Sequence, residues 1–212
     1  MQVKGQEFPM HEPRFKQGMG MGYAVCPTGA CHVQSYHDSD FEKAGSSLEG
    51  LQGLGILEPM PTTELSPRKV RVFSYGQNWW SFLNSAVHCL FVPFNHGEMV
   101  ELVNAVTGWD TSVWELEKVG ERGTSLARVY NVREGFTARD DTLPDRMFEP
   151  LPTGVLKGVA VDRQEFERAK QFYYGMQGWD ANGVPRVMDE RGNWVLWEPA
   201  SLPSEQAGKD HW

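Results

Sequence analysis

The stretch GMGYAVCPTGACH, residues 20–32, decides how the rest of the chain is interpreted. It holds too many small and turn-forming residues for a packing element, so it predicts an ordered loop. The loop ends on Cys31 and His32, residue types that bind metals or move protons. Its counterpart is WWSFLNSAVHCLF, residues 79–91, whose apolar residues recur at helical spacing. These two stretches therefore hold the residue types in this sequence that are best suited to carry chemistry.

The second stretch carries Asn84, His88 and Cys89 on one side of the expected helix, where a core would use leucine. Asn84 and His88 are four residues apart and share a face. That face either looks at solvent or is buried against a polar ligand. The apolar residues on both sides predict deep burial, and buried polar groups need partners, which favours a ligand.

Cys89 and His32 each have a structural and a functional interpretation. Cys89 is either a buried structural cysteine or one metal ligand among thiolates that come from elsewhere, because no Cys-x-x-Cys surrounds it. His32 is either a helix-start histidine bonded to the backbone or a proton donor and acceptor beside a redox metal. Cys26 and Cys31 are expected to be small packing residues.

Three other histidines, His11, His37 and His96, give no comparable signal and are expected at the surface or at helix caps. The arginines and acidic residues between positions 121 and 141 predict a salt-bridge network rather than a site.

Composition excludes several classes of protein. A net charge of −8 and a pI near 5.3 argue against nucleic acid as a partner. The three cysteines do not form a disulfide framework, which predicts free thiols in a reducing compartment, the cytoplasm. We expect no membrane association, because no apolar run reaches membrane-spanning length and the N-terminus is no signal peptide. That N-terminus instead looks like an internal connecting segment.

Periodicity and capping signals predict a mainly α fold with long ordered loops. Helices are expected at about residues 74–94, 98–107, 112–136 and 162–175, with a short helix near 39–44, an optional one within 24–36 and a short strand at 194–197. Residues 1–35 are otherwise expected to be irregular. We expect a Gly/Pro-rich active-site loop region at 1–75 and a helical C-terminal domain with an irregular tail at 76–212.

Four stretches resemble the tungsten-containing aldehyde:ferredoxin oxidoreductase family, in its C-terminal portion only. They are VKGQEFPMHEPRFKQGMGMGYA (3–24), PTGACH (27–32), NSAVHC (84–89), and residues 106–146 followed by FYYGMQGWDANGVP (172–185). The third stretch stands where the family has D-x-x-G-L-C. The resemblance implies the family's helical C-terminal domains and covers most of the chain.

The resemblance also implies cofactors and roles. It implies a tungsten or molybdenum bis-pterin and a [4Fe–4S] cluster, with aldehydes oxidised to carboxylic acids and electrons passed to ferredoxin or a similar carrier. Cys89 aligns with the fourth cluster ligand, His32 with a catalytic histidine near the tungsten, and Asn84 and His88 with positions that touch the pterin. Here Asn replaces Asp, which removes a charge-assisted contact. Val87 replaces Gly, and its Cβ crowds a close backbone approach.

The family's N-terminal domain and its cysteine triplet are absent from the sequence, so we expect a missing domain or subunit to complete the site. An oligomer is compatible with this. The alternatives are the same fold acting on aromatic acyl thioesters or other acids, and an inactive fragment or non-catalytic helical module. If the resemblance holds, the PTGACH loop and the segment 84–89 should line one half-built concavity, rimmed by Trp79, Trp80 and Phe94.

Overall fold

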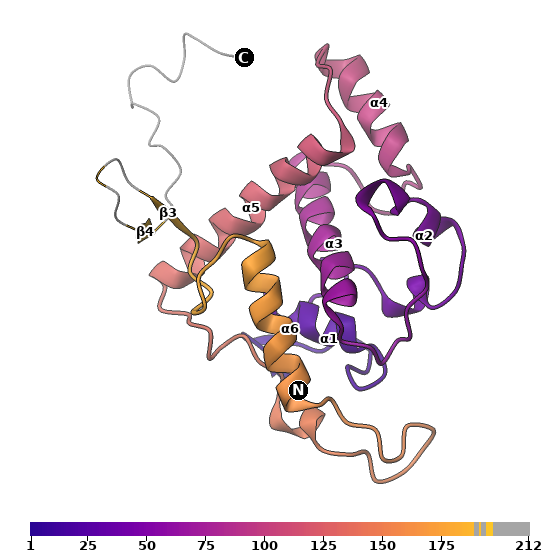
Figure 1. The fold of residues 1–212 in the computed structure, drawn as a ribbon, viewed down its shortest axis with the longest axis vertical. Helices are drawn as coiled ribbons and strands as arrows, with labels where there is room; N and C mark the ends of the chain where they lie inside the picture. The colour runs from indigo at the N-terminus through magenta and orange to yellow at the C-terminus, as the bar shows by residue number, and fades with distance from the viewer. Residues whose placement is uncertain (189–190, 192–193, 197–212) are drawn as a thin grey trace.

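The computed structural model describes residues 1–188, 191 and 194–196. Helices dominate this part of the chain, so the predicted mainly α fold is confirmed (Figure 1). The α-helices are α1 (Gln17–Val25), α2 (Ser46–Glu49), α3 (Pro67–Ser85), α4 (His96–Thr107), α5 (Val113–Arg133) and α6 (Arg163–Met176). Short 3-10 helices are η1 (Asp38–Phe41), η2 (Gln52–Leu54) and η3 (Asp145–Phe148). The strands β1 (Gln2–Val3) and β2 (Gln6–Glu7) pair antiparallel, as do β3 (Arg186–Met188) and β4 (Trp194–Leu196).

The centre of the fold is the crossing of α3 and α5 (Figure 1). Helices α1 and α6 pack beside α3. Helix α4 lies at the opposite end of the molecule from α1 and α6 and contacts α5. Gly120 of α5 permits this crossing. A Cβ built there would lie 1.7 Å from the carbonyl oxygen of Asn78, so any larger residue would push the helices apart. A second apolar cluster, which includes Phe82, Met99 and Leu116, fills the angle between α3, α4 and α5.

The Gly-rich segment forms a buried helix, α1, instead of the predicted irregular structure. Its glycines allow close packing, since a Cβ at Gly18 would lie 2.4 Å from the ring of Phe73 on α3. The buried carboxylate of Asp38 accepts from the backbone N–H groups of Gly18 and Met19 and pairs with Lys69 Nζ at 2.8 Å. Tertiary contacts therefore override a local sequence that disfavours a helix.

The predicted helix at 74–94 is wrong at both ends, because α3 begins at Pro67 and ends at Ser85. At its C-terminus the N–H of Val87 bonds to Asn84 and the N–H of His88 bonds to Leu83 at 2.9 Å. These two bonds form a Schellman motif. It places Val87 at φ 54°, a left-handed conformation that favours glycine. Consequently His88 and Cys89 lie beyond the helix, and the shared helical face of Asn84 and His88 does not exist.

The other helices follow their local signals. Ser112 and Glu115 form the predicted capping box of α5, and Gly108 ends α4 in a left-handed conformation. Asp162 caps α6 through the N–H of Glu165. The predicted short helix near 39–44 corresponds to η1. The expected strand at 194–197 appears as β4, while residue 197 lies outside the described residues.

One buried carboxylate, that of Asp141, joins distant parts of the chain. Lys4 Nζ lies 2.7 Å and Arg128 Nη2 lies 2.9 Å from its two oxygens, and the Tyr174 hydroxyl donates to it as well. Lys170 Nζ donates to the Asp141 carbonyl at 3.2 Å. The predicted salt-bridge network is therefore present at Arg128 and Asp141, and both side chains are buried in the core.

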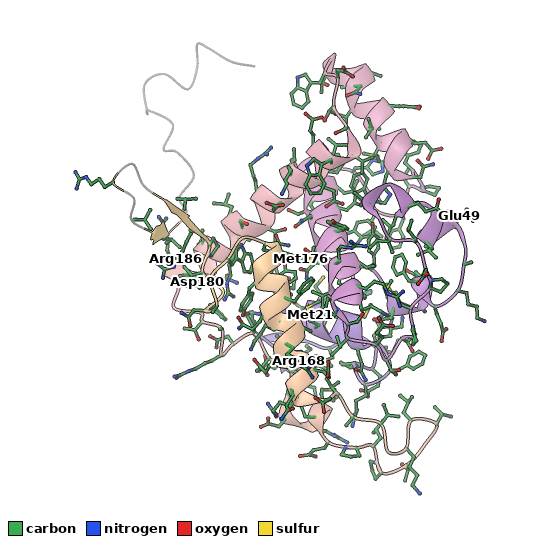
Figure 2. All side chains as sticks on the ribbon, viewed as in Figure 1. Met21, Glu49, Arg168, Met176, Asp180 and Arg186 are labelled. Carbon is green, nitrogen blue, oxygen red and sulfur yellow. The ribbon has the colours of Figure 1, made fainter. Side chains whose placement is uncertain are left out.

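The β3–β4 hairpin projects from the helical body and is fastened at its base. Arg186 Nε lies 2.6 Å from Asp180 Oδ2, and Figure 2 shows the two side chains beside each other, away from the buried Met21. The expected division between residues 75 and 76 falls inside α3 and stays a prediction. Within the described residues, no helix is both long and apolar enough to cross a membrane.

Candidate functional site

A cavity of about 380 Å³ opens where the loop after α1 meets α3 and α5; we name it the polar cavity. Its lining residues are Cys26, Pro27, Thr28 and Gln34 of the loop, Gln77, Trp80, Ser81, Asn84 and Ser85 of α3, and Gly123, Thr124 and Ala127 of α5. The predicted meeting of the PTGACH loop with the segment 84–89 is observed only in part, because Pro27, Thr28, Asn84 and Ser85 line this cavity whereas His32, His88 and Cys89 do not. Segments more than fifty residues apart in sequence form one concavity.

Hydrogen bonds hold the walls of the polar cavity in place. Cys26 Sγ donates to Gln34 Oε1 at 2.8 Å, and Asn131 Nδ2 of α5 donates to the Pro27 carbonyl at 2.8 Å. Gln77 Nε2 donates to the Gly22 carbonyl at 3.1 Å, while its Oε1 accepts from the Tyr173 hydroxyl at 2.5 Å. The loop is therefore tied to α5, and α3 is tied to both α1 and α6.

The lining of the polar cavity is neutral. Its polar groups are hydroxyls and amides, and none of the described residues that line it carries a formal charge. Cys26 is no exception, because burial raises the pKa of its thiol. A site of this kind recognises a ligand through hydrogen bonds to neutral polar edges rather than through ion pairs.

His32 does not line the polar cavity but belongs to a cluster of three histidines. Its ring centroid lies 5.1 Å from that of His11 and 6.1 Å from that of His37. Lys16 Nζ donates to His37 Nδ1 at 2.8 Å. Burial, reinforced by the Lys16 ammonium and the neighbouring imidazoles, lowers the pKa of His37 to about 4. Burial and Lys16 lower the pKa of His11 as well.

His88 and Cys89 belong to the segment 86–95 that follows α3, and neither residue lines the polar cavity. Cys89 is exposed, and the ring of His88 stacks on Phe94 with centroids 5.6 Å apart. The Nε2 atom of His88 is buried and finds no hydrogen-bond partner among the described residues. Asn84 is exposed at the cavity mouth instead of deeply buried as predicted. The apolar residues that suggested burial, Phe91 among them, lie at the surface.

The expected aromatic rim is found only in part. Trp80 lines the polar cavity and Phe94 is 47% exposed, but Trp79 is buried at 4%. Cys26, Cys31 and Cys89 are free thiols. Within the described ranges, no group of three or more His, Cys, Asp or Glu side chains could hold a metal ion.

Comparison with known proteins places these features in a family. A family model described as "Aldehyde ferredoxin oxidoreductase, domains 2 & 3" matches residues 1–189. The chain belongs to the aldehyde ferredoxin oxidoreductase family. The match to domains 2 and 3 agrees with the resemblance to the C-terminal portion and with the helical fold.

Relatives in this family are oxidoreductases, and the chain matches only part of each. The tungsten-containing aldehyde ferredoxin oxidoreductase of Pyrococcus furiosus is 34% identical over 191 residues, which are 88% of this chain and 29% of the relative. Its counterpart in Thermococcus kodakarensis is 34% identical over 195 residues, 90% of this chain and 30% of the relative. The aliphatic sulfonate oxidoreductase, WOR-like subunit, of P. furiosus is 33% identical over 121 residues, which are 53% of this chain and 19% of the relative. The chain thus spans about 30% of its aldehyde-oxidoreductase relatives.

The histidine cluster was missed by sequence reasoning, which assigned His11 and His37 to the surface or to caps. The available signal was the number of histidines near the motif, since three of them fall within residues 11–37. Spacing alone did not reveal the cluster, because the fold of the intervening α1 brings the rings together.

Proposed function

We propose that this chain forms one wall of a tungsten or molybdenum bis-pterin site in an enzyme that oxidises aldehydes to carboxylic acids. The polar cavity carries the proposal. A pterin presents amide and amine groups along one edge, and the neutral donors and acceptors of Ser81, Asn84 and Thr124 complement them. The cavity has no cation for the phosphate end of the cofactor, which must be held by another part of the enzyme.

When bound, the metal supplies the two-electron oxidation of the aldehyde. The chain's own residues orient the pterin, exclude water and handle protons. We assign orientation of the pterin to Asn84 in the polar cavity and to His88 in the segment that follows α3, whose buried Nε2 has no hydrogen-bond partner among the described residues. Val87 shapes the path between them, because its left-handed backbone turns the chain away from α3.

His32 is proposed to accept and release the protons that aldehyde oxidation produces. Its neighbours favour this role, because His11 and His37 have lowered pKa values and remain neutral near pH 7. A positive charge on the His32 ring acts by coulombic repulsion to lower the pKa of both neighbours. Replacing His32 by Gln in the assembled enzyme should flatten the pH dependence of kcat.

The iron–sulfur cluster does not fit this chain alone. A [4Fe–4S] cluster needs about four thiolates, and Cys89 offers one. We propose Cys89 as a single ligand to a cluster whose other thiolates belong to the missing domain or subunit. Its exposure supports this, because a buried thiol could not reach a partner. Ferredoxin or a similar carrier, acting in the cytoplasm, would then receive the electrons.

The experiment compares the chain alone with the assembled enzyme. The isolated chain should be colourless and inactive towards aldehydes, whereas the complex purified through a tag on this chain should contain tungsten or molybdenum together with iron. Asn84→Leu should reduce the metal content of the complex several-fold. Asn84→Asp should keep it, and the exposed control Gln52→Leu should leave it unchanged. A metal-free complex, or a brown isolated chain, would contradict the proposal.

A second candidate substrate class has one supporting observation. The sulfonate oxidoreductase subunit among the relatives indicates that related chains serve other substrates. Assays of the complex with aldehydes, aromatic acyl thioesters and other acids would separate these reactions. If no complex forms and no cofactor is found, the chain is an inactive fragment or a helical interaction module.

A further inference from the structure

A second cavity, of about 420 Å³, lies on the other side of Trp80 from the polar cavity; we name it the aromatic cavity. The side chains that matter here are the rings of Tyr36, Phe41, Trp79, Trp80 and Phe94, together with Asp40. They come from η1 and the residue stretch before it, from α3, and from the segment 86–95. The volume is in the range of small-molecule sites, which begin at about 300 Å³.

The rings form walls that meet at an angle instead of a stacked layer. Tyr36 lies edge-on to Trp80, with centroids 6.0 Å apart and an interplanar angle of 65°. It is also edge-on to Phe41, at 5.2 Å and 69°. These inclined rings line one cavity, and aromatic faces attract cations through their quadrupole.

Asp40 is the one ionised side chain among the described residues that line this cavity. His96 also lines it, but burial lowers the pKa of His96 to about 4, so its imidazole is neutral near pH 7. The Tyr36 hydroxyl and His96 Nε2 are 3.1 Å apart and satisfy each other. In the described part of the chain Asp40 has no ion-pair partner within 4.0 Å, although it accepts hydrogen bonds from the His37 backbone and Ser39. A negative charge therefore lines an aromatic cavity without a direct ion pair among the described residues, and the Lys16 ammonium acts on it only from beyond ion-pair distance.

We propose that the aromatic cavity binds an organic ammonium ion, such as a quaternary ammonium group. The ion would contact the ring faces of Tyr36, Trp80 and Phe94 and neutralise Asp40. A neutral apolar ligand would fill the same space but would desolvate the carboxylate without compensation. A metal ion would lack the several oxygen ligands that it needs, since Asp40 is a single carboxylate. Charge and ring geometry together favour a cation that carries apolar methyl groups.

The test compares choline with 3,3-dimethylbutan-1-ol, its neutral counterpart of the same shape, by titration calorimetry on the 212-residue chain. Choline should bind at least about tenfold more tightly than the alcohol. Asp40→Asn should weaken choline binding at least about fivefold. Phe94→Leu should weaken it about threefold, as expected for the loss of one cation–π contact of about 0.5–1 kcal/mol. Both changes fall at exposed positions, so the fold should be retained.

Two matched controls identify the cavity as the site. Glu42→Gln removes an exposed carboxylate two residues from Asp40, and Phe91→Leu removes an exposed ring from the same segment as Phe94. Neither residue lines the cavity, and both variants should bind choline like the original chain. Equal affinity for choline and the alcohol, no binding of either, or an equal loss in the controls would overturn the proposal.

Discussion

Replacing Val87 by Gly should stabilise the protein by about 1 kcal/mol. Val87 occupies the position after the cap of α3 with φ 54°, where a residue with a Cβ is held at a cost of about 1–2 kcal/mol. Its side chain is 92% exposed, so removing it forfeits little buried apolar surface. Glycine has more conformational freedom in the unfolded chain, and this offsets about 0.4–1 kcal/mol of the stability gained by relieving the strained backbone. The balance remains favourable because β-branched residues are especially poor in this conformation.

Urea unfolding followed by far-UV circular dichroism would measure the change. The gain of about 1 kcal/mol should raise Tm by about 2–4 °C for a chain of this size. Val87→Ala is the first control, because alanine keeps the Cβ and should gain less than glycine. Ala86→Gly is the second, because Ala86 has an ordinary right-handed conformation and glycine there should destabilise. The reasoning fails if Val87→Gly is no more stable than the original, or if Val87→Ala gains as much.

Four further substitutions, one of them a control, test the packing and the buried charges. Gly120→Ala should destabilise the protein by at least about 3 kcal/mol, because the alanine Cβ would lie 1.7 Å from the Asn78 carbonyl oxygen. The control Gly175→Ala on α6 has open space around the new Cβ and should be neutral or stabilise by up to about 1 kcal/mol. Thermal unfolding of both variants would measure the two changes. Asp38→Ala should cost about 3–5 kcal/mol by stranding the buried Lys69 ammonium, and an unchanged urea midpoint would refute that. Burial raises the pKa of Glu117 from 4.5 to about 9, so the folded state holds a proton that the unfolded state releases, and stability falls as pH rises between these values. Glu117→Gln should therefore become progressively more stable than the original from pH 5 to pH 8.5; parallel pH profiles in urea would contradict this.

The helices that could be predicted are those whose ends are defined locally. The Ser112–Glu115 box and the Asp162 cap lie in the sequence next to the helices that they begin. The start of α5 and of α6 therefore follows from hydrogen bonds between residues three apart. Gly108 ends α4 for an equally local reason.

The elements that could not be predicted depend on distant residues. The glycines of α1 look like loop residues until Phe73 is seen to occupy the space that their side chains would fill. The apolar pattern continues past Ser85 to Phe91, and Val87 offers none of the signals that end a helix. The helical spacing of the apolar residues therefore predicted a helix that continues beyond Ser85. That prediction wrongly placed Cys89 on a helical face.

For the candidate site, it could be predicted that the loop after α1 meets α3, but not which of the candidate residues line the cavity. Pro27 and Asn84 line one cavity, as the family resemblance implied. His32 instead contacts His11 and His37, and no sequence period reports such a contact. The roles assigned to His32, Asn84, His88 and Cys89 stay predictions.

The Asp141 carboxylate sets the order in which a growing chain can become native. Lys4 leaves the ribosome well before its buried partner, which follows 137 residues later, and Tyr174 follows later still. At about 5–20 residues per second, the N-terminal hairpin waits several seconds or more before its ammonium can be neutralised. Until then Lys4 is more stable in water than in the core. The β1–β2 hairpin must therefore dock late, after α6 has been synthesised, although it precedes every helix in this part of the chain.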